Sequence, residues 1–488
     1  MKYQFLLFLI PFLLIACNNE SGTKGEDKKP SERNVSAVTE EPESLVKVDL
    51  QDIRERDTLK AIMTYSSTSY FLYRGQTMGY EYELLTRLAE HMGLHLEVVM
   101  AEDLNKMFDM LQRGEGDLIA HGMTITRERK EEFRFTKMHT TTHQSLVQRK
   151  PENWRQMKLH NIRKTLVQDP LDLIGKTVHL RENSSYFQRI QNLMDEIGGE
   201  INVETVSGEY TTEDLIQMVA SGEIKYTMAD HNIAAINKTY NPILDISVPL
   251  SFSQRIAWVV RKNSPELLDE INSWITSMRK KTDYYVIYNK YFKNKKAYKR
   301  RIKSDLYAAN KGKISKYDNL IKTYADSINW DWRLFASLIY QESKFNPNAK
   351  SWVGARGLVQ MMPATAKELG FTNLTHPETS VKAGSKYLEK LEQSWQEIPA
   401  EERHKFVMAS YNAGPNHVAD ARRLAEKHGA DPNQWHGQVE DYLLKLSQKK
   451  YYTDDVVKYG YCRGSEPYQY VREIYERFEH YKKFVPNE

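Results

Sequence analysis

The sequence has little cysteine, no excess of charge of one sign, and an apolar run only at its start that is too short for a membrane span. Its 488 residues hold two cysteines, Cys17 and Cys462, and 69 Lys and Arg against 65 Asp and Glu leave a net charge of +4. A charge this close to balance argues against a dedicated nucleic-acid binder, and no nucleic-acid partner is expected. The apolar residues 5–16 are too few to cross a bilayer as a mature helix.

The N-terminus instead has the features of an export signal. Lys2 precedes the apolar run, and Cys17 ends it. The residues 14–17, Leu-Ile-Ala-Cys, resemble the lipobox of bacterial lipoproteins, in which the cysteine becomes the lipidated first residue; a plain anchor helix is the alternative. Lipidation of Cys17 would leave Cys462 without a partner for an intramolecular disulfide. Because Asn18 follows, and not Asp, the resemblance implies a lipid anchor in the outer membrane, facing the periplasm.

The length predicts two or three domains, at roughly 150 residues each. Residues 1–16 are predicted to be the signal peptide. Residues 17–50 are polar and rich in Pro, Gly and Ser, which is typical of a flexible tether. The change in character near residue 300 then separates a domain over residues 51–300 from one over residues 301–488.

Strand and helix patterns alternate over the first of these domains. Buried strands are expected at residues 59–65, 95–101 and 117–123, and amphipathic helices at residues 81–94, ending at Gly93, and 104–116. The rhythm restarts near residue 172 and returns near residue 255 as a strand and a closing helix. Such alternation predicts mostly parallel sheets covered by helices, arranged as two α/β lobes.

This domain resembles the amino-acid-binding extracellular solute-binding proteins, family 3, which are two-lobed clamps that close on a small ligand. The resemblance is carried by GYEYELLTRLAEHMGL, GDLIAHGMTITRERKEEFRFT, ENSSYF and MADHN. It implies that Arg129 holds a ligand carboxylate and that Asp230 receives an ammonium group. The full set of clamp residues implied is Tyr70, Thr124, Arg129, Ser184, Ser185 and Asp230.

Other interpretations of these residues stay open. Thr124, Ser184 and Ser185 are also suited to capping helices, and Asp230 to a turn or a helix N-cap. The sequence departs from the family pattern at Met138-His139, which replace Pro-Tyr, and in the additional stretch 151–170. An amino acid or a peptide is therefore the expected class of ligand, without a particular member.

Beyond residue 300 the pattern is mainly helical. Leu334, Leu338 and Ile339 form one apolar stripe, and Asp331 is suited to be the N-cap of their helix. Glu342 falls in the last turn, where the helix dipole and apolar neighbours would both raise the pKa of a carboxyl group. An acid that stays protonated near neutral pH can donate a proton to a leaving oxygen.

The segments around and after Glu342 resemble, in order, the signatures of lytic transglycosylases with the lysozyme-like fold. They are IYQES, GARGLVQMMP, ASYNAGP and RGSEPYQYVREIYERF. The resemblance makes Glu342 the catalytic residue, with Ser343 orienting it and Tyr470 hydrogen-bonded to it. The residues implied for the sugar groove are Ser343, Gly357, Gln360, Met361, Tyr411, Asn412 and Tyr470. Met361, Met362 and Tyr470 are equally suited to the core.

One carboxylate is enough if the sugar supplies its own nucleophile. Retaining and inverting hydrolases both need a second carboxylate. In peptidoglycan, the N-acetyl carbonyl of the muramic acid can attack C1, and its C6 hydroxyl can close a 1,6-anhydro ring without water. Glu342 would serve first as acid and then as base. Glu466 and Asp331, the most tempting second acids, are interpreted as structural.

The predicted protein is a multidomain chain, a two-lobed α/β periplasmic-binding-protein-like clamp followed by a mainly α lysozyme-like domain. The predicted function is non-hydrolytic cleavage of peptidoglycan by a lipid-anchored enzyme whose clamp senses wall peptides or amino acids. The alternative is a lipid-anchored amino-acid or peptide receptor with a catalytically weak lysozyme-like domain. A transporter's solute-binding subunit is disfavoured, because such proteins end after the clamp. No cofactor and no metal are expected.

Overall fold

The computed structural model describes residues 46–182, 184–207, 210–307 and 312–486. The predicted signal peptide, Cys17 and most of the tether lie outside these residues. The last residues of the predicted tether already belong to the fold, because the Val48 carbonyl accepts a hydrogen bond from Ser264 Oγ at 2.7 Å. Asp49 then caps α1 (Leu50–Glu55). In the described part of the chain, no helix combines the length and apolar character that a membrane crossing requires.

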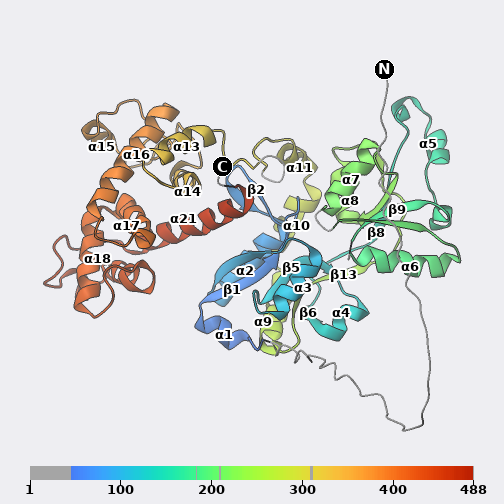
Figure 1. Ribbon diagram of the computed structural model, residues 1–488, viewed down its shortest axis with the longest axis horizontal. Helices are drawn as coiled ribbons and strands as arrows, with labels where there is room; N and C mark the ends of the chain where they lie inside the picture. The colour runs from blue at the N-terminus through green and yellow to red at the C-terminus, as the bar shows by residue number, and fades with distance from the viewer. Residues whose placement is uncertain (1–45, 183, 208–209, 308–311, 487–488) are drawn as a thin grey trace, which may run out of the picture. The chain divides into compact units, whose positions relative to one another are not determined.

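The first lobe is built on a mixed sheet (Figure 1). The strand order is β4 (His95–Met100), β1 (Thr58–Met63), β5 (Leu118–Thr124), β13 (Gln254–Arg261) and β6 (Phe133–Phe135), with β7 (Thr140–Thr142) also on β13. The strands β4, β1 and β5 run parallel, as the alternation predicts, whereas β13 is antiparallel to β5. The helices are α2 (Tyr80–Met92), α3 (Leu104–Gln112), α4 (Arg127–Glu132), α9 (Pro265–Met278), α10 (Thr282–Tyr288), η3 (Asn289–Lys293) and α11 (Lys295–Ile302).

The predicted helix end at Gly93 is confirmed. Gly93 takes the left-handed conformation at φ +70° and its N–H bonds back to the last turn of α2. Leu84, Leu85 and Leu88 of this helix are buried in the first lobe's core, which accounts for its amphipathic pattern.

The second lobe is also built on a mixed β-sheet. Its strand order is β10 (Asn202–Val206), β9 (Thr177–Arg181), β11 (Tyr226–Asp230), β8 (Gln144–Arg149) and β12 (Leu244–Asp245). Its helices are η1 (Trp154–Gln156), α5 (Leu159–Thr165), η2 (Pro170–Leu173), α6 (Ser185–Ile197), α7 (Thr212–Ser221) and α8 (His231–Lys238). The chain enters this lobe after β7 and leaves it before β13, so two connections join the lobes. The additional stretch 151–170 forms η1 and α5 beside this sheet.

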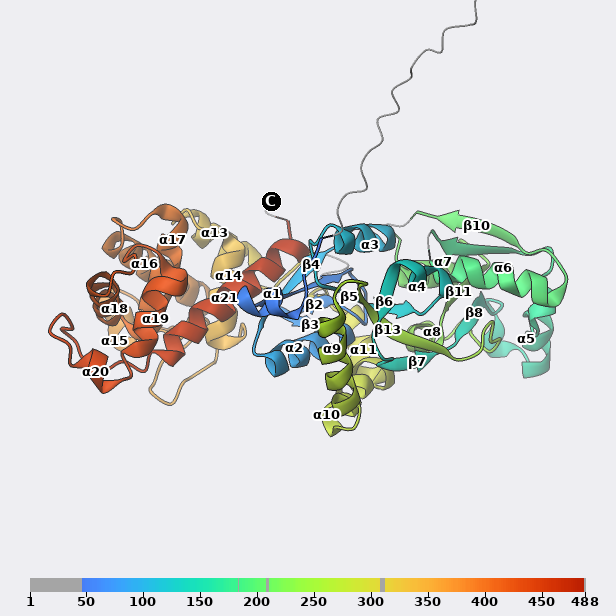
Figure 2. The ribbon, with the colours of Figure 1, turned by 90° about the horizontal axis from the view of Figure 1, so that it is seen from below.

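The C-terminal domain is helical in its described residues (Figure 2). Its elements are α13 (Asp318–Asp326), α14 (Trp332–Ser343), α15 (Pro363–Glu368), α16 (Pro377–Ser394), α17 (Ala400–Ala413), α18 (Pro415–Lys427), η4 (Trp435–Val439), α19 (Glu440–Lys445), α20 (Lys449–Tyr452) and α21 (Ser465–Phe484). One hydrophobic core runs through it, with α14 packed between α13 and α21. The mainly α prediction for this domain is confirmed.

A short hairpin of the first lobe packs into this helical domain. It consists of β2 (Phe71–Tyr73) and β3 (Gln76–Met78). Leu72 is fully buried in the helical core, and the Gly75 carbonyl accepts a hydrogen bond of 2.7 Å from Tyr481 Oη of α21. The long helix α21 therefore contacts both domains.

Candidate functional site

The helix α14 is buried over most of its length and carries Glu342 in its last turn. Asp331 is its N-cap, as predicted, and accepts a hydrogen bond of 2.9 Å from the Arg333 N–H. Every residue from Trp332 to Ile339 is buried, which holds the helix firmly in the core. Lys344 ends the helix in the left-handed conformation at φ +50°. Glu342 thus emerges at a fixed place, in the last turn.

The carboxyl group of Glu342 is held by Tyr470 from α21. Tyr470 Oη donates to Glu342 Oε1 at 2.5 Å. Burial raises the pKa of Glu342 to about 7, although the hydrogen bond from Tyr470 acts in the opposite direction. Burial also raises the pKa of Tyr470 well above its ordinary value, so its hydroxyl remains a donor. Near neutral pH, a large share of Glu342 therefore carries a proton that it can donate.

A groove opens in front of this carboxyl group. Its space of about 590 Å³ is in the range of ordinary ligand sites, roughly 300–1000 Å³. It is lined by Gln341, Glu342, Asn412, Arg463, Ser465, Glu466, Gln469, Tyr470 and Glu473. Asn412 and Tyr470 had been predicted here from the sequence. The polar face of α21 was not predicted. The four-residue spacing of Ser465, Gln469 and Glu473, which places them on one face of a helix, is the signal in the sequence that indicates it.

Other residues predicted for the groove build its supporting loop. Gln360 Nε2 donates to the carbonyls of Ala349 at 3.0 Å and Gly357 at 2.9 Å. Tyr411 Oη donates to the Val359 carbonyl at 2.7 Å. Met361 is buried in the core of the domain. These contacts hold residues 349–361 in one conformation.

Gly357 and Ser343, two further residues predicted for the sugar groove, also lie against the backbone of their own domain. Gly357 has φ +82°, and a Cβ there would lie 2.0 Å from the Leu374 carbonyl oxygen, so the position requires glycine. Ser343 is buried and donates to the Ile339 carbonyl at 3.2 Å within its own helix. The structure therefore gives Ser343 a contact different from the predicted one with Glu342.

Three other carboxylates of this domain, Asp331, Glu466 and Glu473, differ in their surroundings. Asp331 is bound to Arg333 by an ion pair of 2.6 Å at the far end of α14, which agrees with a structural role. Glu466 is exposed in the first turn of α21 but lines the same groove as Glu342. Glu473 Oε2 and Oε1 accept amide hydrogen bonds from Gln341 at 2.6 Å and Gln469 at 3.2 Å.

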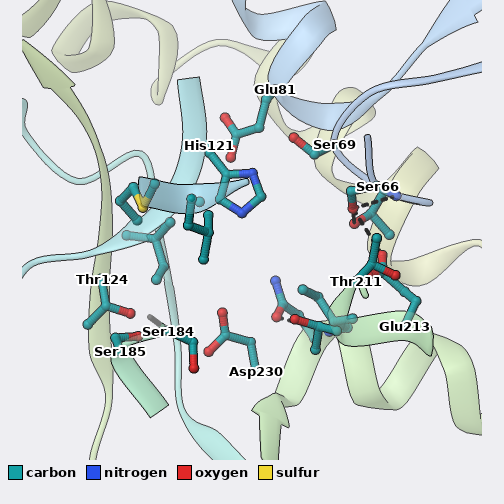
Figure 3. Close-up of a pocket in the computed structure, with 18 of the residues that line it drawn as sticks. Ser66, Ser69, Glu81, His121, Thr124, Ser184, Ser185, Thr211, Glu213 and Asp230 are labelled. Carbon is teal, nitrogen blue, oxygen red and sulfur yellow. Dashed lines mark hydrogen bonds between the residues drawn. The ribbon is translucent and has the colours of Figure 1, made fainter. Parts of the chain in front are cut away.

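A separate cavity lies between the two lobes of the clamp (Figure 3). The structure brings Thr124, Arg129, Ser184, Ser185 and Asp230 together in its wall, although they come from distant parts of the sequence. Thr124 ends β5, Ser184 precedes α6, and Asp230 ends β11. At about 100 Å³ the space is smaller than typical ligand pockets of roughly 300 Å³ or more, so a ligand of ordinary size requires the lobes to separate.

Asp230 and Arg129 are two of the charged residues in the wall of this cavity, which also contains Glu81, Arg181 and Glu213. Asp230 is buried, and burial raises its pKa to about 7. Its Oδ1 has no hydrogen-bond partner among the described residues. Arg129 Nη1 donates to the Thr124 carbonyl at 3.4 Å, and its guanidinium lies 5.2 Å from the centre of the Phe108 ring. A buried carboxyl group without a partner suits a ligand that brings a donor.

The cavity also contains groups that had not been expected from the sequence. Glu213 of α7 accepts hydrogen bonds from Ser66 Oγ at 2.9 Å and Ser67 Oγ at 2.8 Å, which joins the two lobes (Figure 3). His121 lies in the same wall, and burial lowers its pKa to about 3. Glu81 Oε2 accepts a hydrogen bond of 2.7 Å from Trp258 Nε1. The hydroxyl-rich run 66–69 after the first strand was the available signal.

The prediction that Tyr70 covers the ligand has to be corrected. Tyr70 is fully buried beside α21, and its hydroxyl lies 2.5 Å from His480 Nδ1. It does not line the cavity, whereas Tyr65 does. The ring of Tyr65 also packs against Phe484 of α21, with 4.9 Å between ring centres. The packing of α21 on the first lobe therefore takes Tyr70 away from the predicted position.

Two family models match the chain, one over the clamp and one over the helical domain. Residues 59–294 match the model of the bacterial extracellular solute-binding proteins, family 3. Residues 319–433 match the transglycosylase SLT domain. Together with Glu342, whose pKa is raised to about 7 in the groove of the helical domain, they define the class of the protein: a lytic transglycosylase joined to a solute-binding clamp.

Full-length relatives then identify the family. A membrane-bound lytic murein transglycosylase F from Desulfosudis oleivorans is 34% identical over 427 residues, which cover 87% of this chain and 90% of the relative. The protein of the same name from Pseudoalteromonas translucida is 32% identical, with 87% of each chain covered. The chain belongs to the membrane-bound lytic murein transglycosylase F family. The prediction that it is a lytic transglycosylase is confirmed.

Solved structures similar to this chain cover the clamp. A mutant of ArgBP from T. maritima is 24% identical, with a TM-score of 0.42, and the match covers 50% of this chain and 98% of that one. An ancestral arginine-binding protein bound to arginine is 26% identical, with a TM-score of 0.41, over 49% of this chain and 99% of that one.

Proposed function

We propose that the chain cleaves the β-1,4 bond between N-acetylmuramic acid and N-acetylglucosamine in peptidoglycan without water, leaving 1,6-anhydromuramyl ends. The observation that carries this proposal is Glu342, an acid of pKa about 7 in the groove with a tyrosine hydroxyl at 2.5 Å. A protonated carboxyl group is what the leaving oxygen requires.

The proposed reaction uses Glu342 twice. Glu342 first gives its proton to the glycosidic oxygen. The bond from that oxygen to C1 of the muramic acid breaks as the N-acetyl carbonyl oxygen forms a bond to C1, and the N-acetylglucosamine leaves with a free hydroxyl group. The C6 hydroxyl then attacks C1, displaces that carbonyl oxygen and returns its proton to Glu342. The hydroxyl of Tyr470 stabilises the carboxylate that exists between the two steps, because it donates a hydrogen bond to it.

The products and a matched pair of variants test this proposal. Purified murein sacculi are incubated with the protein, and the released muropeptides are analysed by mass spectrometry. Anhydromuramyl ends, lighter than hydrolytic ends by one water, are expected. Glu342→Gln should abolish release, whereas Glu473→Gln should retain it. Reducing ends as the main product would overturn the proposal and indicate that Glu466 or Glu473 serves as a second catalytic carboxylate.

We further propose that the clamp binds an amino acid or a wall peptide. Arg129 would receive the ligand carboxylate and the unpartnered Asp230 the ammonium group. Such a ligand can influence cleavage only if it binds two states of the chain with different affinity. Calorimetric titration with amino acids and stem peptides, on the wild type and on Arg129→Ala, tests the site. Equal binding by both proteins would exclude it.

The location is proposed from the sequence and from the relatives' name. The relatives are named membrane-bound. We infer that a lipid on Cys17 anchors the chain in the outer membrane, facing the periplasm. Metabolic labelling with a fatty acid and membrane fractionation should find the wild type labelled in the outer membrane. Cys17→Ala should be unlabelled, and a label on that variant would contradict the anchor.

A further inference from the structure

A second cavity adjoins the catalytic groove at the junction of the helical domain and the first lobe. We call it the junction cavity. Its space of about 400 Å³ is in the range of ordinary ligand sites, roughly 300–1000 Å³. One wall consists of Tyr340, Glu473, Glu476, Arg477 and His480, and the other of Gln76, Thr77, Tyr82, Glu83, Thr86, Arg87 and Lys290. Neither domain alone provides both walls.

The junction cavity and the catalytic groove follow one face of α21. Glu473 lines both spaces. Ser465 and Gln469 precede it in the groove, and Glu476 and His480 follow it in the junction cavity. Spacings of three and four residues keep these side chains on the same face of a helix. From Tyr470 to Glu476 the helix rises about 9 Å, at 1.5 Å per residue.

Hydrogen bonds connect the side chains where the two spaces meet. Arg477 Nη2 donates to Gln341 Oε1 at 2.9 Å, and Gln341 Nε2 donates to Glu473 Oε2 at 2.6 Å. The Arg477 guanidinium also lies 4.6 Å from the centre of the Tyr340 ring. This network fixes the border between groove and junction cavity, so that a ligand extending from one meets ordered polar groups in the other.

Both walls of the junction cavity carry charges of both signs. The helical domain contributes Arg477 and Glu476, and the first lobe contributes Lys290, Arg87 and Glu83. Lys290 is paired with Glu83 at 2.5 Å. A site with carboxylates and cations side by side suits an extended ligand that carries both ammonium and carboxylate groups.

We propose that the junction cavity binds the peptide stem attached to the muramic acid whose sugar ring lies in the groove. This inference rests on the proposed function. A stem peptide carries carboxylate and ammonium groups, and three or four extended residues span about 10–14 Å. That reach covers the rise of roughly 9 Å along α21 from Tyr470 to Glu476. The enzyme therefore selects glycan strands that carry peptides, and the first lobe forms half of this selectivity site.

The experiment compares two substrates that differ only in the peptide. Soluble glycan strands with intact stems, and the same strands after an amidase has removed the stems, are cleaved by the full-length protein. The measured quantity is the ratio of kcat/KM for the two substrates. Wild type should prefer peptide-bearing strands by about tenfold, as expected for roughly one charge-assisted hydrogen bond.

Two variants change the junction cavity from opposite walls. Glu476→Lys reverses a charge on α21, and Thr86→Trp fills the cavity from the first lobe. Each should lower the preference toward one. Glu479→Lys is the matched control, because Glu479 is exposed on the same helix, outside the cavity, and paired with Lys482 at 2.6 Å. It should keep the wild-type ratio.

The other outcomes overturn the inference. Cleavage of both substrates with equal kcat/KM by wild type would exclude a peptide subsite and leave the proposed function standing. A preference that both cavity variants retain would place peptide recognition elsewhere, and its loss in Asp230→Ala would place it in the clamp. No release from either substrate by wild type would refute the proposed function itself, and the inference with it.

Discussion

Replacing Glu342 by glutamine should make the catalytic domain more stable at alkaline pH, in addition to inactivating it. The pKa of this carboxyl group is raised from 4.5 to about 7 by burial. The folded domain therefore holds the proton more tightly than the unfolded chain. Ionisation between these two values costs stability, and the cost is complete above pH 7. The glutamine side chain does not ionise, and its amide oxygen can still accept the hydrogen bond from Tyr470.

The pKa shift sets the size of the effect. The rise in the pKa of Glu342 from 4.5 to about 7 corresponds to about 3.4 kcal/mol, at about 1.36 kcal/mol per pH unit. Because Glu342 faces an open groove and water reaches it, we expect about 2 kcal/mol. This raises the melting temperature by about 4–8 °C for a domain of this size. Glu342→Gln should thus gain stability over the wild type at pH 8 and almost none at pH 4.

Calorimetric melting at both pH values checks this expectation. Glu466→Gln is the control, because Glu466 is exposed in the same groove. Equal stability of Glu342→Gln and wild type at pH 8 would refute the reasoning. So would a gain of the same size at pH 4, since that gain could not come from ionisation.

Three further changes test other parts of the site. Tyr470→Phe removes a hydrogen bond that favours the ionised form of Glu342, so the alkaline limit of muropeptide release should move up by about one pH unit; an unmoved or lowered limit would contradict this. Gly357→Ala should destabilise the domain by about 3 kcal/mol or more, because its Cβ would meet the Leu374 carbonyl oxygen at 2.0 Å. Gly370→Ala, at φ +81° with open space around it, should cost only about 1–2 kcal/mol in thermal melts. Asp331→Ala and Asp331→Asn both lose the ion pair with Arg333, but only Asp331→Ala also loses the cap of α14, so it should melt with about 1 kcal/mol less stability than Asp331→Asn; equal melting of the two variants would exclude the cap.

The sequence alone determined the features that depend on neighbours along the chain. The alternation of strands and helices, the end of α2 at Gly93 and the N-cap Asp331 were all predictable, because periodicity and capping act over a few residues. The position of Glu342 in the last turn of α14 belongs to the same group. Resemblance to known signatures then added Tyr470 and Asn412 to its site.

Only the tertiary structure decided which distant groups meet. Tyr470 reaches Glu342 across 128 positions, and Glu213 reaches Ser67 across 146. Such contacts depend on how whole elements pack, which no local pattern records. Tyr70 shows the consequence, because its sequence context suggested a ligand contact and the packing of α21 against the first lobe buries it beside His480. The junction cavity likewise exists only where two domains supply its opposite walls.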